Sequence, residues 1–320
     1  MSPASRGPSP RVMGGWISLR DAIADAQRRL AAAGVPSPET DAVLLAAHVM
    51  GVPRGRLLLH DRLEPEQRTA YERLLTRRLG RVPLQHLVGV APFRNLELHV
   101  GPGVFIPRPE TELVAQEAID VLRSLPAEDR RAVDLCTGSG AMALALATEA
   151  APASVWAVEV DPEALTWTRR NVDEQSTALS EMGSRVEVVD ADARTCARDG
   201  GPLADLCAAV AVVTMNPPYV PEGARVRDPE VRDFDPAIAL YGGPDGMAVI
   251  RGGIDSAARL LRPGGLVVIE HSDEQGMESE EGVPALLAAD DRWVEISDHR
   301  DLARKPRFTR AIRGPGGGLT

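Results

Sequence analysis

The tetrapeptide Asn216-Pro217-Pro218-Tyr219 is the segment whose residue types indicate chemistry most directly. It follows an apolar run, Ala208 to Met215, that predicts a buried strand, and open α/β sheets bind their ligands where such strands end. Asn216 offers a side-chain carbonyl, and the Pro217-Pro218 step offers a backbone carbonyl whose direction is fixed by locked φ angles. Two such acceptors can hold both hydrogens of a flat NH2 group, and Tyr219 can cover that group. The tetrapeptide therefore predicts a site that presents a nucleophilic nitrogen, from an amide or an exocyclic base amine, to an electrophile.

A glycine-rich segment earlier in the chain is typical of a nucleotide-binding turn. The run Arg131 to Leu135 predicts a strand, Cys136-Thr137-Gly138-Ser139-Gly140 follows it, and an Ala/Leu-rich helix comes next. Glycines at such a turn let the backbone approach a ligand closely, and the helix N-terminus favours negative charge. The next strand, Val155 to Glu159, ends on a carboxylate that can accept hydrogen bonds from both ribose hydroxyls of an adenosine. These features fit NAD and S-adenosylmethionine equally, and the Asn-Pro-Pro-Tyr segment favours the methyl donor, S-adenosylmethionine.

With these residues in place, the chain resembles the protein glutamine-N5 methyltransferases, and within them the peptide chain release factor glutamine methyltransferases of the HemK/PrmC type. The resemblance runs from about Trp16 to about Ile312. Its most specific part is Pro107-Arg108-Pro109-Glu110-Thr111-Glu112, because many nitrogen methyltransferases share the Asn-Pro-Pro-Tyr element. The matching segments are Pro83 to Gly89, Phe105 to Glu112, Asp134 to Gly140, Asn216 to Tyr219, Leu240 to Gly246, and Pro263 to His271.

The resemblance implies a protein-modifying enzyme. It would transfer a methyl group from S-adenosylmethionine to the side-chain amide nitrogen of the glutamine in the Gly-Gly-Gln loop of class I release factors. Asn216 to Tyr219 would be the catalytic and substrate-binding residues, and Asn216 would also border the cofactor site. Arg108 and Glu110 are candidates for the rim of the substrate pocket, since Pro107 and Pro109 limit the entropy of their loop; a structural salt bridge is the alternative.

Three other functions remain open. Ribosomal protein L3 is the substrate of a sister family that shares the tetrapeptide. An adenine-N6 nucleic acid methyltransferase would use the same tetrapeptide on a flipped base, but would normally need a basic groove or a target-recognition domain. A non-catalytic adenosine-binding module is the third, and the intact tetrapeptide argues against it because a pure binder needs no oriented acceptor pair.

Two positions depart from the family pattern. Cys136 stands where the family usually has glycine, which is tolerable if the φ angle there is negative. The family often places an aromatic ring near the adenine after the third strand, whereas the corresponding stretch here, Asp190 to Arg194, has none. Asp192 could instead accept a hydrogen bond from the adenine amino group, with Ala193 beside it at the cofactor site.

The fold class expected is α/β, a class I S-adenosylmethionine-dependent methyltransferase with a Rossmann-like doubly wound sheet and a terminal antiparallel hairpin, preceded by a small N-terminal helical bundle. Alternating strands and helices from about Glu112 to Glu270 carry the α/β part. The bundle contains no candidate chemistry, so we expect it to recognise the protein substrate. The expected divisions are a disordered tail at 1–15, the helical domain at 16–88, a β-hairpin connector at 89–104, the methyltransferase domain at 105–313 and a disordered tail at 314–320.

Composition limits the partners. The net charge is −10 and the pI is near 5.2, whereas a protein that holds nucleic acid by its phosphates usually shows a basic stripe. The basic clusters Arg54-Arg56 and Arg77-Arg81 lie in the predicted helices, where a solvated face is a better explanation than a partner contact. We therefore expect no stable nucleic acid binding, and a monomer.

The remaining titratable residues predict no metal site. Three cysteines without metal-ligand spacing indicate a reducing compartment, and no apolar run is long enough to span a bilayer, so a cytoplasmic location without membrane contact is expected. His271 is interpreted as a structural cap or pocket wall. Glu270 beside it either borders the pocket or faces a helix, and the sequence leaves both open.

Overall fold

A computed structural model describes residues 12–13 and 16–315, which form two compact units. The first unit contains residues 12–13, 16–89 and 227–234, and the second contains residues 90–226 and 235–315. Most of the two predicted disordered tails lies outside the described residues. Within the first tail, Val12–Met13 form a short strand that pairs with Trp16–Ser18. No helix in the described part of the chain combines the length and apolar character needed to cross a bilayer.

The first unit is a helical bundle edged by short strands. Ser18 caps its first helix, since the Ser18 hydroxyl accepts from the Asp21 backbone N–H, and Leu19, Ala26 and Leu30 bury the helix face with apolar spacing. The elements are β1 (Val12–Met13), β2 (Trp16–Ser18), α1 (Leu19–Ala32), α2 (Pro38–Met50), η1 (Arg54–Leu59), β3 (Arg62–Leu63), α3 (Pro65–Leu79), α4 (Leu84–Val88) and, from much later in the sequence, α8 (Pro229–Phe234).

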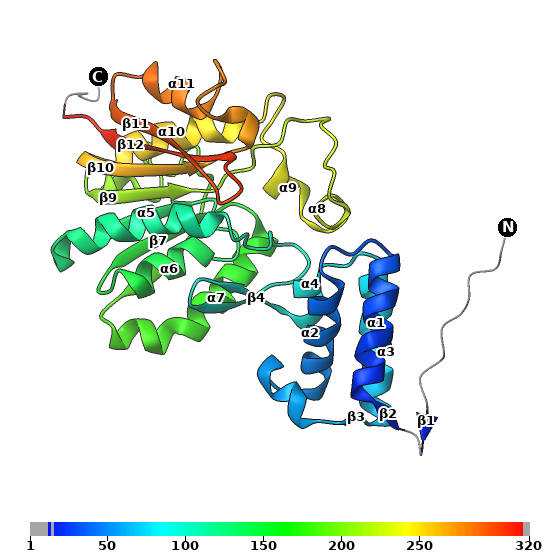
Figure 1. Cartoon of the computed structure of the whole chain (residues 1–320). Coiled ribbons are helices and arrows are strands. Elements are labelled where there is room, and N and C mark those ends of the chain that lie inside the picture. The colour runs from blue at the N-terminus through cyan, green and yellow to red at the C-terminus, as the bar shows by residue number, and fades with distance from the viewer. Residues whose placement is uncertain (1–11, 14–15, 316–320) are drawn as a thin grey trace. The chain divides into compact units, whose positions relative to one another are not determined.

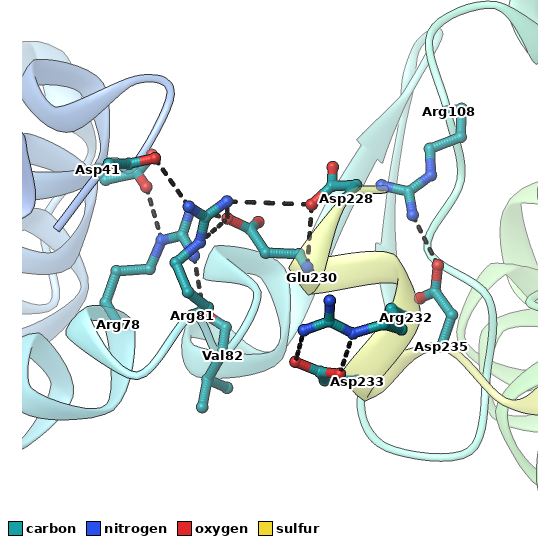
Figure 2. A network of polar contacts seen from close by, with 11 residues as sticks. Asp41, Arg78, Arg81, Val82, Arg108, Asp228, Glu230, Arg232, Asp233 and Asp235 are labelled. Atoms are coloured by element: carbon teal, nitrogen blue, oxygen red, sulfur yellow. Dashed lines mark hydrogen bonds and ion pairs between the residues drawn. The ribbon is translucent and has the colours of Figure 1, made fainter. Parts of the chain in front are cut away.

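Helix α8 joins this unit through a buried ion network (Figure 2). Arg78 on α3 is 3% exposed and donates to Asp41 on α2 at 2.7 Å and to Glu230 on α8 at 2.8 Å. Arg81 donates to the same Glu230 oxygen at 3.0 Å. Because a buried guanidinium is costly without carboxylate partners, these ion pairs hold α8 in the helical unit. The predicted helical domain, 16–88, did not include this segment.

The second unit is built on a seven-stranded sheet in the order β11-β12-β10-β9-β6-β7-β8. Strands β6 to β10 pair with one another in parallel, and β12 and β11 add an antiparallel hairpin beside β10 at one edge. This topology confirms the predicted doubly wound sheet with its terminal hairpin. The strands are β4 (Val90–Phe93), β5 (Leu96–His99), β6 (Arg131–Leu135), β7 (Ser154–Glu159), β8 (Arg185–Asp190), β9 (Val210–Met215), β10 (Leu261–Glu270), β11 (Trp293–Arg300) and β12 (Pro306–Arg313).

Helices cover both faces of this sheet (Figure 1). Alternate strand residues point to opposite faces: Ala132 and Val212 pack with α5 and α6, whereas Val133 and Val213 pack with α10. The helices are α5 (Thr111–Ser124), α6 (Ala141–Glu149), α7 (Pro162–Glu181), α9 (Ala237–Leu240), α10 (Ala248–Leu260) and α11 (Val283–Ala288), with short 3-10 turns η2 (Ala127–Asp129), η3 (Ala204–Leu206) and η4 (Asp273–Gln275). The β4–β5 hairpin precedes α5 and forms a separate two-stranded sheet.

Candidate active site

The glycine loop and the tetrapeptide leave neighbouring strands at the same edge of the sheet. Strands β6 and β9 are paired in parallel, with Leu135 opposite Met215, so Cys136 and Asn216 begin adjacent loops. Fully buried Asp134 links the two strands, because it accepts from the hydroxyls of Thr137 at 2.6 Å and Thr214 at 2.7 Å. Burial raises the pKa of Asp134 to about 6, although both hydroxyls lower it. The carboxyl ends of β6 and β9 therefore form one site.

Side chains of α7 hydrogen-bond the backbone of the glycine loop, residues 136–140. The Thr168 hydroxyl donates to the Gly138 carbonyl at 2.6 Å, and the Asn171 amide donates to the Ser139 carbonyl at 2.9 Å. Gly138 has φ +59°, and a Cβ placed on it would meet nothing within 4 Å. A ligand can therefore approach the Gly138 backbone directly.

Cys136 adopts a left-handed conformation, with φ +61°. The sequence predicted that Cys136 would be tolerated if its φ angle were negative, and the structure contradicts that condition. A side chain in the left-handed region costs roughly 1–2 kcal/mol. Glycine would adopt this conformation without that cost. Burial raises the pKa of the Cys136 thiol well above its ordinary value, so the side chain stays a neutral thiol at this turn.

Glu159, at the end of β7, is fixed by three backbone groups. Its Oε2 accepts from Gly138 N–H at 2.8 Å, and its Oε1 accepts from Val160 and Asp161 N–H at 2.9 and 3.0 Å. Burial raises the pKa of this carboxyl, and the three N–H groups partly offset that shift. Since a carboxylate has about four lone-pair positions, one position on Oε2 remains for a ligand hydroxyl. The sequence predicted that Glu159 would accept hydrogen bonds from both ribose hydroxyls.

Asp192 lies in the loop after β8 and is engaged with a neighbour. Both of its oxygens accept from the Arg194 guanidinium, at distances from 2.6 to 3.0 Å. This ion pair lowers the pKa of Asp192. The adenine contact expected of Asp192 would therefore compete with Arg194. Ala193 beside it is buried among the core residues on the α10 face of the sheet.

Asn216 is half-buried and makes one side-chain contact. Its Nδ2 donates to the Thr111 hydroxyl at 3.2 Å, and its Oδ1 accepts from no residue in the described ranges. Pro217 is buried, and Tyr219 packs partly against the core on the α10 face. Burial raises the pKa of Tyr219 to about 12, which keeps its hydroxyl neutral. The Asn216 carbonyl is thus available to a ligand.

The Leu240-to-Gly246 segment packs directly on the tetrapeptide backbone. Gly242 donates its N–H to the Val220 carbonyl at 2.9 Å, and Val220 donates to the Leu240 carbonyl at 2.8 Å. A Cβ on Gly242 would lie 2.3 Å from the Pro218 carbonyl oxygen, and one on Gly246 would lie 2.3 Å from the Tyr219 oxygen. Only glycine allows this approach at either position.

Arg108 and Glu110 are not paired with each other. Arg108 donates to Asp235 at 2.7 Å (Figure 2) and lies over the Phe105 ring at 4.9 Å. The Asp235 side chain is 1% exposed, so the Arg108 ion pair is a structural one that ties the segment before α5 to the chain after α8. Glu110 is half-buried at the start of α5.

Thr111 contacts Asn216, and Glu270, whose role the sequence left open, ends the strand next to β9. Thr111 begins α5 and is 4% exposed, and Glu270 ends β10 and is 2% exposed. Burial raises the pKa of the Glu270 carboxyl to about 7. Sequence features could have pointed to both residues, since Thr111 lies in the most specific family segment and Glu270 ends an apolar strand. His271, fully buried, contacts Asp298 and Thr309 at 3.1 and 2.9 Å, as a structural cap would.

The sheet order, the glycine loop after β6, the carboxylate after β7 and the Asn-Pro-Pro-Tyr segment after β9 together define a methyltransferase. Comparison with known families agrees: the methyltransferase small domain matches residues 116–228, and the PrmC N-terminal domain matches residues 21–89. The chain belongs to the release factor glutamine methyltransferase family, and it is an enzyme.

Relatives of that name match almost from end to end. The release factor glutamine methyltransferase of Streptomyces coelicolor is 48% identical over 90% of this chain and 96% of its own length. The Mycolicibacterium smegmatis enzyme is 49% identical, covering 92% of this chain and 98% of its own. The Mycobacterium tuberculosis enzyme is 42% identical, covering 93% and 92%.

Proposed function

We propose that this enzyme transfers a methyl group from S-adenosylmethionine to the side-chain amide nitrogen of the glutamine in the Gly-Gly-Gln loop of class I release factors. One observation carries the proposal most directly. Asn216 has its NH2 group engaged by Thr111 and its carbonyl oxygen free, beside the loop that leaves β6. A glutamine flanked by two glycines can extend into a narrow site, since glycine adds no side-chain bulk.

The residues of the glycine loop and β7 suit S-adenosylmethionine. The open face of Gly138 and the remaining lone pair on Glu159 Oε2 fit an adenosine ribose at the helix N-terminus. The donor would supply a methyl group on a positively charged sulfonium. The protein's part is to hold the acceptor nitrogen in line with that methyl group, and no residue of this site has to act as a general base.

Replacing Glu159 tests the cofactor site. In Glu159→Ala the ribose acceptor is lost and three backbone N–H groups lose their partner, so we expect about ten- to a hundredfold weaker S-adenosylmethionine binding, roughly 1–3 kcal/mol. Glu187→Ala on neighbouring β8, an exposed carboxylate, should bind normally. Calorimetry on both variants decides this, and tight NAD binding without S-adenosylmethionine binding would overturn the cofactor assignment.

The substrate is tested by competition among the candidate acceptors. Labelled methyl donor is supplied with a class I release factor, ribosomal protein L3, total tRNA and DNA, side by side with the same enzyme preparation. We expect label in the release factor alone. Label in ribosomal protein L3 alone would overturn the choice of substrate while leaving the glutamine chemistry intact, and label in nucleic acid would overturn both.

The helical unit is the proposed site of protein recognition. Leu58 and Leu59 on η1 are 92% and 78% exposed, and exposed leucines of this kind gain free energy when a protein partner covers them. We expect Leu58→Ser with Leu59→Ser to raise the KM for the release factor about tenfold and to leave S-adenosylmethionine affinity unchanged. Leu302→Ser, at a 94% exposed leucine in the β11–β12 turn of the other unit, is the control. Unchanged kinetics in the double variant would contradict recognition through η1.

A further inference from the structure

We propose that Asn171 is a positioning residue that couples the glycine loop to the β4–β5 hairpin, so that a cofactor bound at the loop also stabilises the hairpin. The inference rests on the proposed function, in which the glycine loop binds S-adenosylmethionine. Asn171 lies on α7 and is 2% exposed. Its side-chain amide is hydrogen-bonded to both segments.

The Asn171 amide makes three hydrogen bonds to two separate parts of the backbone. Its Oδ1 accepts from His99 N–H at 2.8 Å, and its Nδ2 donates to the His99 carbonyl at 3.0 Å. The Nδ2 also donates to the Ser139 carbonyl at 2.9 Å. Because a backbone N–H can only donate and a carbonyl can only accept, these partners allow one orientation of the amide. The two hydrogens of its NH2 group are thereby shared between the hairpin and the glycine loop.

On the hairpin side, Asn171 takes the place of a neighbouring strand. Strands β4 and β5 form a sheet of two strands, so each has an edge whose backbone groups no further strand of that sheet binds. In an antiparallel strand the N–H and C=O of one residue point in the same direction, and at His99 the Asn171 amide binds both. It therefore supplies, at the end of β5, the donor and the acceptor that a third strand would supply.

The same face of α7 contacts the chain that follows the hairpin. Glu163, Trp167 and Asn171 are spaced four residues apart, which places them on one face of the helix. A Cβ on Gly101 would lie 2.6 Å from the Trp167 ring, and one on Gly103 would lie 2.3 Å from the Glu163 carboxylate. The backbone after β5 therefore packs directly against α7.

This backbone leads to the acceptor side of the active site. Val104 is fully buried in one cluster with Ala164 of α7, and the chain then reaches Thr111, which contacts Asn216 at 3.2 Å. Helix α7 thus holds both the glycine loop and the start of the segment that carries Thr111. Asn171 is the side chain that hydrogen-bonds to both.

A ligand that fixes the glycine loop should fix the hairpin through this amide. If the loop moves, the Ser139 carbonyl leaves the Asn171 Nδ2, and the amide is then free to turn away from His99. A bound cofactor removes that motion and so stabilises the two hydrogen bonds at His99. Because coupling between two sites is reciprocal, an anchored hairpin raises the affinity of the loop for S-adenosylmethionine by the same factor.

The first test is hydrogen–deuterium exchange of the full-length enzyme with and without saturating S-adenosylmethionine. We expect the backbone amides of residues 90–104 in the wild type to exchange about tenfold more slowly when the cofactor is bound. Strand β11, at the edge of the sheet remote from β6, is the internal reference. Unchanged exchange over residues 90–104, or an equal slowing in β11, would overturn the proposal without any variant having to fold.

The second test removes the amide. Asn171→Asp keeps the shape and can still accept from His99 N–H, but its carboxylate has no hydrogen for either carbonyl. Asn171→Ala removes all three hydrogen bonds. By calorimetry, both variants should bind S-adenosylmethionine about ten- to a hundredfold more weakly. At saturating cofactor, neither should show the slowing over residues 90–104, and circular dichroism verifies that each is folded.

Two further variants of α7 are the controls. Thr168→Val removes the hydroxyl that donates to the Gly138 carbonyl and leaves Asn171 in place. It should bind the cofactor more weakly and still show the slowing over residues 90–104. Ser176→Asp adds a negative charge at an exposed position of the same helix and should match the wild type in both measurements.

The possible results separate the coupling from the proposed function. Wild-type affinity and slowing in the folded Asn171 variants would overturn the coupling. Loss of the slowing in Thr168→Val would overturn it too, because any damage to the loop would then act as loss of the amide does. A wild-type enzyme that does not bind S-adenosylmethionine would overturn the proposed cofactor and this inference together. The expected coupling in an enzyme that does not methylate a release factor would support the inference and overturn the proposed substrate.

Discussion

Asn216→Ala should abolish methyl transfer, by at least about a thousandfold, and leave S-adenosylmethionine affinity nearly intact. An amide nitrogen is a poor nucleophile because its lone pair is delocalised into the carbonyl. The enzyme must therefore hold the NH2 group so that the nitrogen faces the sulfonium methyl while charge builds up on it. The Asn216 carbonyl is the side-chain acceptor that we propose for this role. Its removal leaves the glycine loop and Glu159 untouched, since neither contacts the Asn216 side chain.

The measurement pairs single-turnover methyl transfer with calorimetry of cofactor binding. Asn95→Ala is a matched control, because Asn95 is exposed in the turn between β4 and β5, and it should behave as the wild type. Near-normal turnover in Asn216→Ala would show that the pair of acceptors is not the basis of catalysis. A parallel loss of cofactor affinity would show that Asn216 belongs to the cofactor site instead.

Gly242→Ala should reduce turnover by about a hundredfold or more without unfolding the sheet. The added Cβ would lie 2.3 Å from the Pro218 carbonyl oxygen and 2.6 Å from the Gly246 oxygen. Both obstacles are backbone atoms, so no side chain can rotate away, and the loop carrying Asn216 to Tyr219 has to move. A displacement of about 1 Å is enough to cost two orders of magnitude in rate when it falls on a positioning group.

Gly55→Ala is the control for this substitution. Gly55 lies in η1, where an added Cβ would meet no atom within 4 Å and where φ is not positive, so the change should leave the fold and the turnover at saturating release factor unaltered. Thermal unfolding checks that Gly242→Ala is folded, and calorimetry checks that it still binds S-adenosylmethionine. Full turnover in a folded Gly242→Ala would mean that the tetrapeptide backbone tolerates displacement, and that its carbonyl does not fix the substrate.

The main features of the fold followed from local sequence patterns. Apolar runs such as 210–215 predict buried parallel strands, and glycines such as Gly138 mark the turn from strand to helix. Both depend on neighbours within a few residues. The ends of β6, β7 and β9 could therefore be located, and the doubly wound topology places them at one edge of the sheet.

Local sequence patterns do not predict contacts between residues that are far apart in the sequence. Glu230 and Arg78 are 152 positions apart, and nothing near Glu230 in the sequence indicates that a buried arginine needs its carboxylate. Asp192 illustrates a different limit: its type suits an adenine contact, but Arg194 two residues later occupies both of its oxygens. The sign of φ at Cys136 is equally invisible, because the neighbouring Thr137 and Gly138 permit either.

Thr111 shows how a residue can be singled out by its segment and still be given no role. It lies between Glu110 and Glu112 in the most specific family segment. In that segment the charged residues were interpreted as the rim of the substrate pocket. The structure pairs Arg108 with Asp235 and brings uncharged Thr111 to Asn216. The direction in which a side chain leaves the first turn of a helix depends on where that helix begins, which sequence patterns locate only to within a few residues.

The most direct measurement is tandem mass spectrometry of a class I release factor after incubation with this enzyme and S-adenosylmethionine. One methyl group should appear on the side-chain amide of the glutamine in the Gly-Gly-Gln loop. A release factor in which that glutamine is replaced by alanine should gain none. A methyl group on any other residue, or equal methylation of the glutamine-free release factor, would contradict the proposed function.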